Sequence, residues 1–186
     1  MQATIEQAGD YLHEALFDSP IREEDVINVV LSFDNNGRQA IKNYYENKYN
    51  SKGLNDDLKK KLTGTFRDAI INLFLSSVEY DAFELKRSIK GFRTDEECIY
   101  EIIANRPFNT LQEIKKKYYE MYNKTLEADL EKTLNKQIYK NIITILNTER
   151  RVNPKPDFGK CEQDAKTLYT VANGELMKIF SETFLL

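Results

Sequence analysis

An internal repeat is the feature that most limits what this chain can fold into. Ile41 recurs 73 residues later as Ile114, and Leu54 recurs 72 residues later as Leu126. The other matched pairs keep the same order and are Tyr45 with Tyr118, Tyr49 with Tyr122, Asp57 with Asp129, Leu58 with Leu130, Leu62 with Leu134, Ile70 with Ile142 and Ile71 with Ile143. Such regular self-similarity indicates that one supersecondary unit is used twice.

Each copy of the repeat has the pattern of a helical unit. Only 7 Gly and 4 Pro interrupt the 186 residues, and apolar residues recur at spacings of three and four, which predicts an all-α fold. The helices predicted in the first copy are 5–17, 22–32, 36–49, 54–62 and 65–77. Those predicted in the second copy are 81–90, 95–105, 109–122, 126–134 and 136–149. Five helices per repeat are therefore expected.

The repeat also suggests how the chain is divided. The expected order is a first repeat at 1–78, a second repeat at 79–150, a linker at 151–160 and a partial third repeat at 161–186. Pro154 and Pro156 should exclude helix from the linker and stiffen it. The third unit is indicated by the run 164–169, which is similar to the run 81–86 at the start of the second repeat.

Composition argues against several classes of function. With 27 Lys and Arg against 30 Asp and Glu, the net charge is −3, which does not favour nucleic acid as a partner. We expect neither a secretory signal nor a membrane span, because no apolar run approaches the ~20 residues needed. Cys98 and Cys161 lack metal-type spacing and are expected to be reduced thiols. His13 is the one histidine and has no evident partner, so we expect no catalytic residues, no enzyme activity and no organic cofactor.

The stretch 89–103 joins the end of one predicted helix to the start of the next. Gly91 permits the left-handed turn that would close the first helix, and Thr94 is a suitable N-cap for the second. Glu97 follows Thr94 by three residues, so the pair is typical of a capping box. A helix–loop–helix of this kind could also hold calcium with backbone carbonyls and a remote carboxylate.

The second repeat carries a family resemblance. The runs 80–86, 89–96 and 101–106, followed by 112–122 and 126–130, resemble an annexin repeat, and 161–169 is similar to the start of a third one. This resemblance implies an all-α fold with five helices per repeat, usually four repeats in a curved disc, relative to which this chain is truncated. It also implies binding to acidic phospholipid through calcium, which is held by carbonyls of a glycine-containing loop and by an acidic side chain from a later loop of the same repeat.

The residues at the implied calcium positions depart from the family pattern. In the second repeat the second loop glycine is Arg93, and the carboxylate position is the neutral Thr133. In the first repeat the segment 17–22 replaces the glycine loop, and Lys61 stands at the carboxylate position. A lysine repels the ion, so we expect the main sites to bind calcium weakly or not at all. The partial calcium loop that the resemblance leaves consists of Ile89, Gly91, Thr94 and Glu96.

Two interpretations of that loop and of the nearby cations stay open. The Thr94 carbonyl and the Glu96 carboxylate could form a weak subsidiary calcium site, or these residues could simply cap a helix. Cations in or beside the implied membrane-facing loops could bind acidic lipid in place of calcium, or could be ordinary solvated side chains. These cations are Lys59, Lys60, Lys61, Lys90, Arg93, Lys132 and Lys136.

The expected function is peripheral binding to acidic phospholipid at the cytoplasmic, inner face of membranes, with weak or absent calcium dependence. The alternative is a cytosolic scaffold that keeps the fold and binds protein partners. Because annexin repeats normally pack in pairs, two repeats alone would leave apolar helix faces uncovered. We therefore also expect self-association, with Phe180 and Phe184 near the exposed region.

Overall fold

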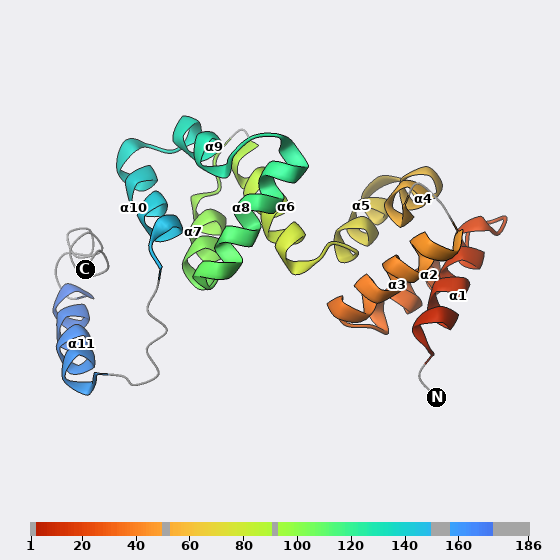
Figure 1. Cartoon of the computed structure of the whole chain (residues 1–186), viewed down its shortest axis with the longest axis horizontal. Coiled ribbons are helices and arrows are strands. Elements are labelled where there is room, and N and C mark those ends of the chain that lie inside the picture. Colours follow the sequence, from red (N-terminus) through yellow and green to blue (C-terminus); the bar gives the residue numbers. More distant parts are fainter. Residues whose placement is uncertain (1–2, 50–52, 91–92, 150–156, 173–186) are drawn as a thin grey trace. The chain divides into compact units, whose positions relative to one another are not determined.

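The chain folds into a succession of helices in this computed structural model, which describes residues 3–49, 53–90, 93–149 and 157–172. All secondary structure elements in these ranges are helical (Figure 1). They are α1 (Ile5–Phe17), α2 (Glu23–Leu31), α3 (Asn35–Tyr49), α4 (Leu54–Lys61), α5 (Gly64–Leu73), α6 (Ser77–Lys90), α7 (Glu96–Asn105), α8 (Phe108–Tyr122), α9 (Leu126–Thr133), α10 (Lys136–Asn147) and α11 (Phe158–Ala172). The all-α prediction is therefore confirmed for the described residues. The chain divides into two compact units, Met1–Phe83 and Glu84–Leu186.

The boundary between α5 and α6 differs from the prediction. Helix α5 ends at Leu73, where the Phe74 amide donates to the carbonyls of Ile70 and Ile71, and α6 begins at Ser77 rather than at 81. The Ser76 amide donates to the Glu79 carboxylate at 2.9 Å, and the Glu79 amide donates to Ser76 Oγ at 3.2 Å. This reciprocal capping box fixes the start of α6 four residues earlier than the apolar pattern indicates.

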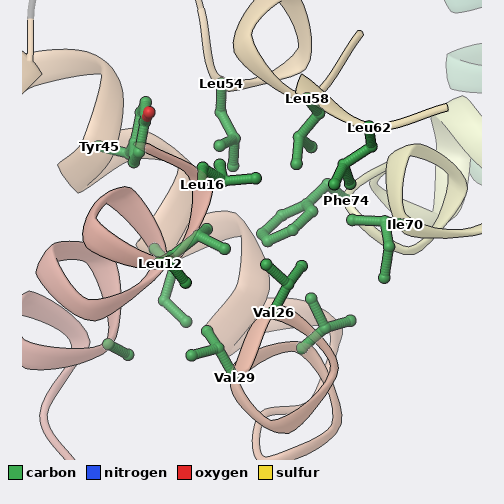
Figure 2. Packing of buried hydrophobic residues seen from close by; sticks show 14 residues of the cluster. Leu12, Leu16, Val26, Val29, Tyr45, Leu54, Leu58, Leu62, Ile70 and Phe74 are labelled. Carbon is green, nitrogen blue, oxygen red and sulfur yellow. The ribbon is translucent and has the colours of Figure 1, made fainter. Parts of the chain in front are cut away.

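The core of the first unit lies between α1, α2, α3, α4 and α5 (Figure 2). Leu12 and Leu16 on α1 face apolar side chains from the other four helices, and full burial of each such side chain contributes roughly 1.5–3 kcal/mol. Helices α1 and α3 approach closely at Gly9, where an added Cβ would lie 2.5 Å from Cδ1 of Tyr44. The labelled members of the core are Leu12, Leu16, Val26, Val29, Tyr45, Leu54, Leu58, Leu62, Ile70 and Phe74.

The second unit buries the matching set of repeated positions. Tyr118, like Tyr45 in the first unit, is fully buried. The fully or almost fully buried side chains include Leu85, Ile99, Ile103, Leu111, Ile114, Tyr118, Leu126, Leu130, Ile142 and Leu146. The pairs that the sequence repeat matches therefore occupy equivalent core positions in the two units.

A side-chain cap on the last carbonyls of the fifth helix is also repeated. In the first unit Gln39 Nε2 donates to the Phe74 carbonyl at 3.1 Å, and in the second unit Gln112 Nε2 donates to the Leu146 carbonyl at 3.0 Å. In the first unit Arg38 Nε also donates to the Leu73 carbonyl at 2.8 Å. Carbonyls at a helix C-terminus have no partner within the helix, so these side chains satisfy them and hold the third helix of each repeat against the fifth.

Helix α11 begins inside the stretch expected to be a linker. The Lys160 amide donates to Asp157 Oδ1 at 3.1 Å, and this cap allows the helix to begin at Phe158 instead of 161. Pro154, Pro156, Phe180 and Phe184, on which the linker and self-association predictions rest, lie outside the described residues. In the part of the chain that the structure describes, no helix combines the length and the apolar character needed to cross a membrane.

Candidate calcium and lipid site

In the first unit, the positions implied to bind calcium are occupied by a cation resting on an aromatic ring. Phe17 is the last residue of α1, and Lys61 is the last residue of α4. The Lys61 ammonium lies 4.1 Å from the centroid of the Phe17 ring, and Phe17 keeps 47% of its surface exposed. This cation–π contact joins the two loops that would have to supply calcium ligands. Lys61 is favourable here also because it lies at a helix C-terminus.

Arg22, in the α1–α2 loop, pairs with Asp18 of that loop and with Asp25 in the first turn of α2. Asp18 Oδ2 lies 2.8 Å from Arg22 Nε, and Asp25 Oδ2 lies 2.7 Å from Arg22 Nη1. Glu14 lies 4.0 Å from the same guanidinium group. Internal pairing with an arginine reduces the negative charge that this loop could offer to a divalent ion.

In the second unit, the N-cap of α7 is Asp95 and not Thr94. Asp95 Oδ1 accepts a hydrogen bond from the Cys98 amide at 3.1 Å, and the helix begins at Glu96. The predicted capping box of Thr94 with Glu97 is therefore wrong. A charged carboxylate is a strong acceptor for amides at the positive end of a helix, and Asp95 stands one residue nearer to that end.

The residues of the partial calcium loop are spread over the end of α6 and the start of α7. Ile89 is almost fully buried in the last turn of α6, Thr94 is half-buried in the loop, and Glu96 is the first residue of α7. Gly91 lies outside the described residues. The loop is closed by the Asp95 amide, which donates to the Ser88 carbonyl at 3.1 Å. Across the described ranges, no three side chains of His, Cys, Asp or Glu gather as a metal-binding cluster.

Thr133, at the implied carboxylate position of the second repeat, is engaged within its own helix. Its hydroxyl donates to the Asp129 carbonyl of α9 at 2.9 Å. The side chain brings no negative charge, and its hydroxyl proton is already used. The second main position therefore lacks the charged oxygen ligand that calcium prefers.

The seven cations predicted to contact lipid lie at helix ends in both units. Among the described residues, six of them form no ion pair, and Lys60 lies 3.8 Å from Asp57. Lys61 is half-buried, whereas the other six are exposed. In the first unit, Lys59, Lys60 and Lys61 form the last turn of α4. In the second unit, Lys90 ends α6, Arg93 precedes α7, Lys132 lies in the last turn of α9, and Lys136 begins α10.

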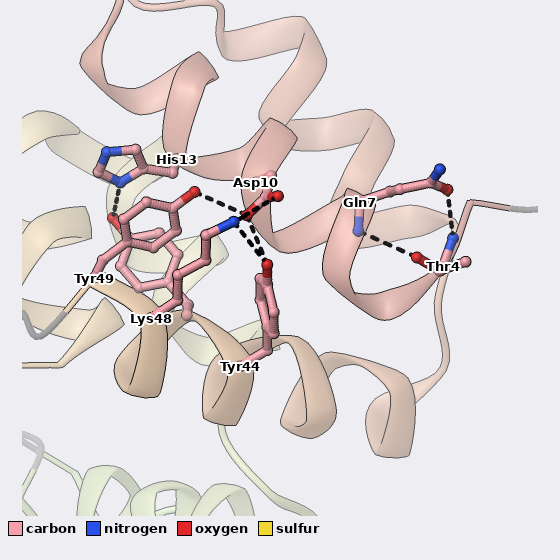
Figure 3. A network of polar contacts seen from close by, with 8 residues as sticks. Thr4, Gln7, Asp10, His13, Tyr44, Lys48 and Tyr49 are labelled. Carbon is pink, nitrogen blue, oxygen red and sulfur yellow. Dashed lines mark hydrogen bonds and ion pairs between the residues drawn. The ribbon is translucent and has the colours of Figure 1, made fainter.

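His13, which has no evident partner in the sequence, is surrounded by partners in the structure. Its ring stacks on Tyr49, which lies beside it in Figure 3, with centroids 3.7 Å apart. It also stacks on Phe17, with centroids 4.5 Å apart. His13 Nδ1 lies 3.1 Å from the Tyr45 hydroxyl, which donates to Asp57 Oδ2 at 3.1 Å. Burial lowers the pKa of His13, although Asp57 and nearby carboxylates oppose this shift.

The second unit has a lysine at the equivalent position. Lys86 follows His13 by 73 residues, and its ammonium lies 2.5 Å from Asp129 Oδ2. The Tyr118 hydroxyl donates to the same oxygen at 2.8 Å. Burial alone would raise the pKa of Asp129, but the hydrogen bonds from Lys86 and Tyr118 hold that pKa below its usual value. Each unit thus buries a tyrosine–aspartate pair beside a basic side chain.

A second polar cluster joins α1 to α3. Asp10 Oδ1 accepts hydrogen bonds from the Tyr44 hydroxyl at 2.9 Å, from the Tyr49 hydroxyl at 2.8 Å and from Lys48 Nζ at 2.6 Å (Figure 3). The Lys48 hydrogen bond, together with those from the tyrosines, lowers the pKa of Asp10. The cluster fixes Tyr49 against α1, which in turn positions the ring on which His13 stacks.

These features define an all-helical repeat protein with exposed cations at its helix ends. The family model for annexins matches residues 7–73 and 80–146, which together cover both five-helix repeats. The chain belongs to the annexin family.

Individual relatives and solved structures agree with this assignment. The chain is 36% identical to annexin A5 of Macaca fascicularis over 154 residues, which cover 83% of this chain and 47% of that protein. It is 31% identical to mouse (Mus musculus) annexin A3 over 153 residues, which cover 82% and 47% of the two chains. The structure of annexin III superimposes with a TM-score of 0.78 at 28% identity, over 91% of this chain and 52% of that one. The chain spans about half the length of the curated relatives that it matches.

As a family, annexins bind acidic phospholipid in a calcium-dependent way, lie peripherally on membranes and are generally not enzymes. A chicken annexin V structure that contains Zn²⁺ superimposes with a TM-score of 0.76 at 25% identity, over 96% of this chain and 57% of that chain.

Proposed function

We propose that this chain binds acidic phospholipid peripherally, at the inner face of membranes, and that its first two repeats depend on calcium weakly or not at all. The observation that most supports the proposal is the Lys61 ammonium, which lies 4.1 Å from the centroid of the Phe17 ring at the position where the family resemblance implies a calcium-binding carboxylate. An ammonium group repels a divalent cation and attracts a lipid phosphate.

The unpaired cations supply the attraction that calcium would otherwise provide. Each Lys or Arg near an anionic leaflet contributes about 1 kcal/mol, so even a few of the six unpaired cations would give measurable attachment at low salt. The net charge of −3 does not oppose this, because screening limits the field to about 10 Å at 0.1 M salt and only local charges count.

A weak calcium site in the second repeat belongs to the same proposal. Its ligands would be carbonyls of the loop from Ile89 through Gly91 to Thr94, with Glu96 as the one carboxylate. Asp95 is engaged as the helix cap, and Thr133 is neutral, so the charge available to calcium is small. We propose no organic cofactor, no catalytic residues and no enzyme activity.

Vesicle sedimentation with a calcium chelator tests the proposed function. The chain should sediment with phosphatidylserine vesicles at low salt in chelator, and calcium should raise the bound fraction only slightly. Phosphatidylcholine vesicles are the control and should not bind. A chain that binds phosphatidylserine only when calcium is added, with calorimetric uptake of calcium to match, would overturn the proposal of weak dependence.

A protein-binding scaffold is the second candidate function, and exposed apolar residues on α2 favour it. Leu31 is 70% exposed and Ile27 is 38% exposed, on the helix that buries Val26 and Val30 on its other side. Such a surface suits either a protein partner or a second copy of this chain. Absence of binding to any vesicle, together with concentration-dependent light scattering, would favour this candidate.

A further inference from the structure

The Phe17–Lys61 pair has the two properties of an interfacial lipid contact. The Phe17 ring is apolar and half exposed, and the Lys61 ammonium above it forms no ion pair with any described residue. An ammonium group has three hydrogen-bond donors, so the contact with the ring leaves donors for an external anion. The adjacent acidic residues, Asp18 and Asp25, are paired with Arg22 and not with Lys61.

This combination favours a lipid headgroup over a free phosphate ion. A dissolved anion would contact only the ammonium and would leave the Phe17 ring in water. At a bilayer surface the same ammonium can reach the headgroup phosphate while the ring enters the boundary between headgroups and acyl chains, where amphipathic groups are favoured. The exposed ring beside the ammonium therefore favours a lipid headgroup over a free phosphate ion.

His13 adds a titratable charge to this pair. The Tyr45 hydroxyl donates its one proton to Asp57, so it accepts the hydrogen bond from Nδ1–H of neutral His13, and a further proton enters at Nε2. Protonation therefore breaks no hydrogen bond and places a cation 4.5 Å from the Phe17 centroid. The titratable and charged groups around His13 are Asp10 and Glu14 on α1, Tyr45, Lys48 and Tyr49 on α3, Asp57 on α4, and Lys61 beyond Phe17.

We propose that Phe17 and Lys61 bind an anionic lipid headgroup directly, and that protonation of His13 strengthens this contact. The inference rests on the proposed function, because it names the residues and the regulation of one lipid contact. The second repeat offers an internal comparison, since Lys86, paired with Asp129, stands at the position of His13. Anionic leaflets favour the protonated state further, because their negative potential concentrates protons at the surface.

Vesicle sedimentation in chelator with four variants tests the inference. Lys61→Gln should weaken binding to phosphatidylserine vesicles about fivefold, the effect of one charge near the leaflet. Phe17→Ser should weaken binding, whereas Phe17→Trp should preserve it. The matched control, Lys116→Gln, removes one exposed charge from the middle of α8 and should change binding little. Circular dichroism verifies the fold of each variant. If a Phe17 variant does not fold, the comparison of Lys61→Gln with Lys116→Gln decides the outcome.

The effect of His13 is measured at about pH 7.5 and about pH 5.5, because burial lowers the pKa of His13 below its ordinary 6.5 and carboxylates ordinarily titrate lower still. Wild-type affinity should rise up to about fivefold at the lower pH. His13→Gln should abolish the rise, and His13→Lys should bind tightly at both pH values. A rise that persists in His13→Gln would overturn the role of His13.

The remaining outcomes separate the inference from the proposed function. Equal binding of Lys61→Gln and Lys116→Gln would overturn the inference while the proposed function stands. Displacement by inorganic phosphate at matched ionic strength would overturn the lipid assignment in favour of a free-anion site. If the wild-type protein does not bind phosphatidylserine vesicles in chelator, both the inference and the proposed function are overturned.

Discussion

At the scale of single residues, the two repeats differ most at equivalent positions 13 and 86. Both side chains lie beside a buried tyrosine–aspartate pair, but burial lowers the pKa of the His13 imidazole, whereas Lys86 forms an ion pair with Asp129. The imidazole stacks on Tyr49, whereas the Lys86 ammonium lies 5.3 Å from the Tyr122 centroid and binds Asp129 directly. The same framework thus holds an ion pair in one repeat and a stacked imidazole ring in the other.

Replacement of His13 by Gln should reduce the acid sensitivity of folding. The pKa of His13 is lowered in the folded chain from an ordinary value of 6.5, chiefly by burial. As the pH falls below that value, the unfolded chain takes up a proton before the folded chain does, so the stability present at higher pH is lost until the folded pKa is reached. Thermal unfolding followed by circular dichroism from about pH 7.5 to about pH 5 measures this, and melting curves of the two proteins that stay parallel would contradict it.

Replacement of Asp129 by Asn should destabilise the second unit strongly. The Lys86 ammonium and the Tyr118 hydroxyl both bind Asp129 Oδ2, and the Asp129 side chain is only 9% exposed. Loss of one partner from a buried ion pair costs about 3–5 kcal/mol, because the remaining charge stays buried without compensation.

Urea denaturation measures the loss. Glu162→Gln, which removes one member of the exposed Lys166–Glu162 pair on α11, is the matched control and should change the free energy of unfolding by less than about 0.5 kcal/mol. Equal losses of unfolding free energy in the two variants would contradict the prediction that the buried Asp129 pair stabilises the fold more than an exposed pair does.

At the scale of the helix, the residues that begin each element decide its length. Asp95→Ala should destabilise the chain by about 1 kcal/mol, because the Cys98 amide loses its acceptor. Thr94→Ala should cost much less, since no cap hydrogen bond depends on its side chain. Urea denaturation of both variants tests the placement of the cap, and a larger loss for Thr94→Ala would restore the threonine as the N-cap.

The helices could be predicted from the apolar pattern, but their ends and the site could not. The pattern places Tyr45 and Tyr118 in the core, where both are fully buried. It cannot choose between adjacent capping residues such as Thr94 and Asp95, because that choice depends on backbone geometry. Nor does spacing reveal that His13 contacts Tyr45, because residues 32 apart meet only once α1 and α3 are packed.

At the scale of the whole molecule, the family could be predicted because the second repeat keeps the residues that shape its loops. The departures at Lys61 and Thr133 could also be found by comparison with the family pattern. The contact between Lys61 and Phe17 could not be predicted, because the sequence does not show which side chain an aromatic residue in a replaced loop will contact. The proposed lipid contact therefore depends on side chains that only the folded chain brings together.

Membrane attachment by scattered cations should depend steeply on salt. If the six unpaired cations provide the attraction, binding to phosphatidylserine vesicles in chelator should fall severalfold between about 50 mM and 300 mM NaCl, because the Debye length shortens from about 14 Å to about 6 Å. Sedimentation at a series of salt concentrations measures this, with sucrose at equal osmolarity as the control. Binding that ignores salt would indicate insertion of apolar side chains instead.

The stacking of His13 between Phe17 and Tyr49 gives the protein its own spectroscopic reporter. Histidine occurs once in this chain, so the imidazole carbon-bound protons give two NMR signals that need no assignment strategy. Both neighbouring rings have centroids within 4.5 Å, so their ring currents displace these signals from the ordinary positions. Any molecule that moves Phe17 will shift them, and events at the end of α1 can be followed in the unlabelled, unmodified protein.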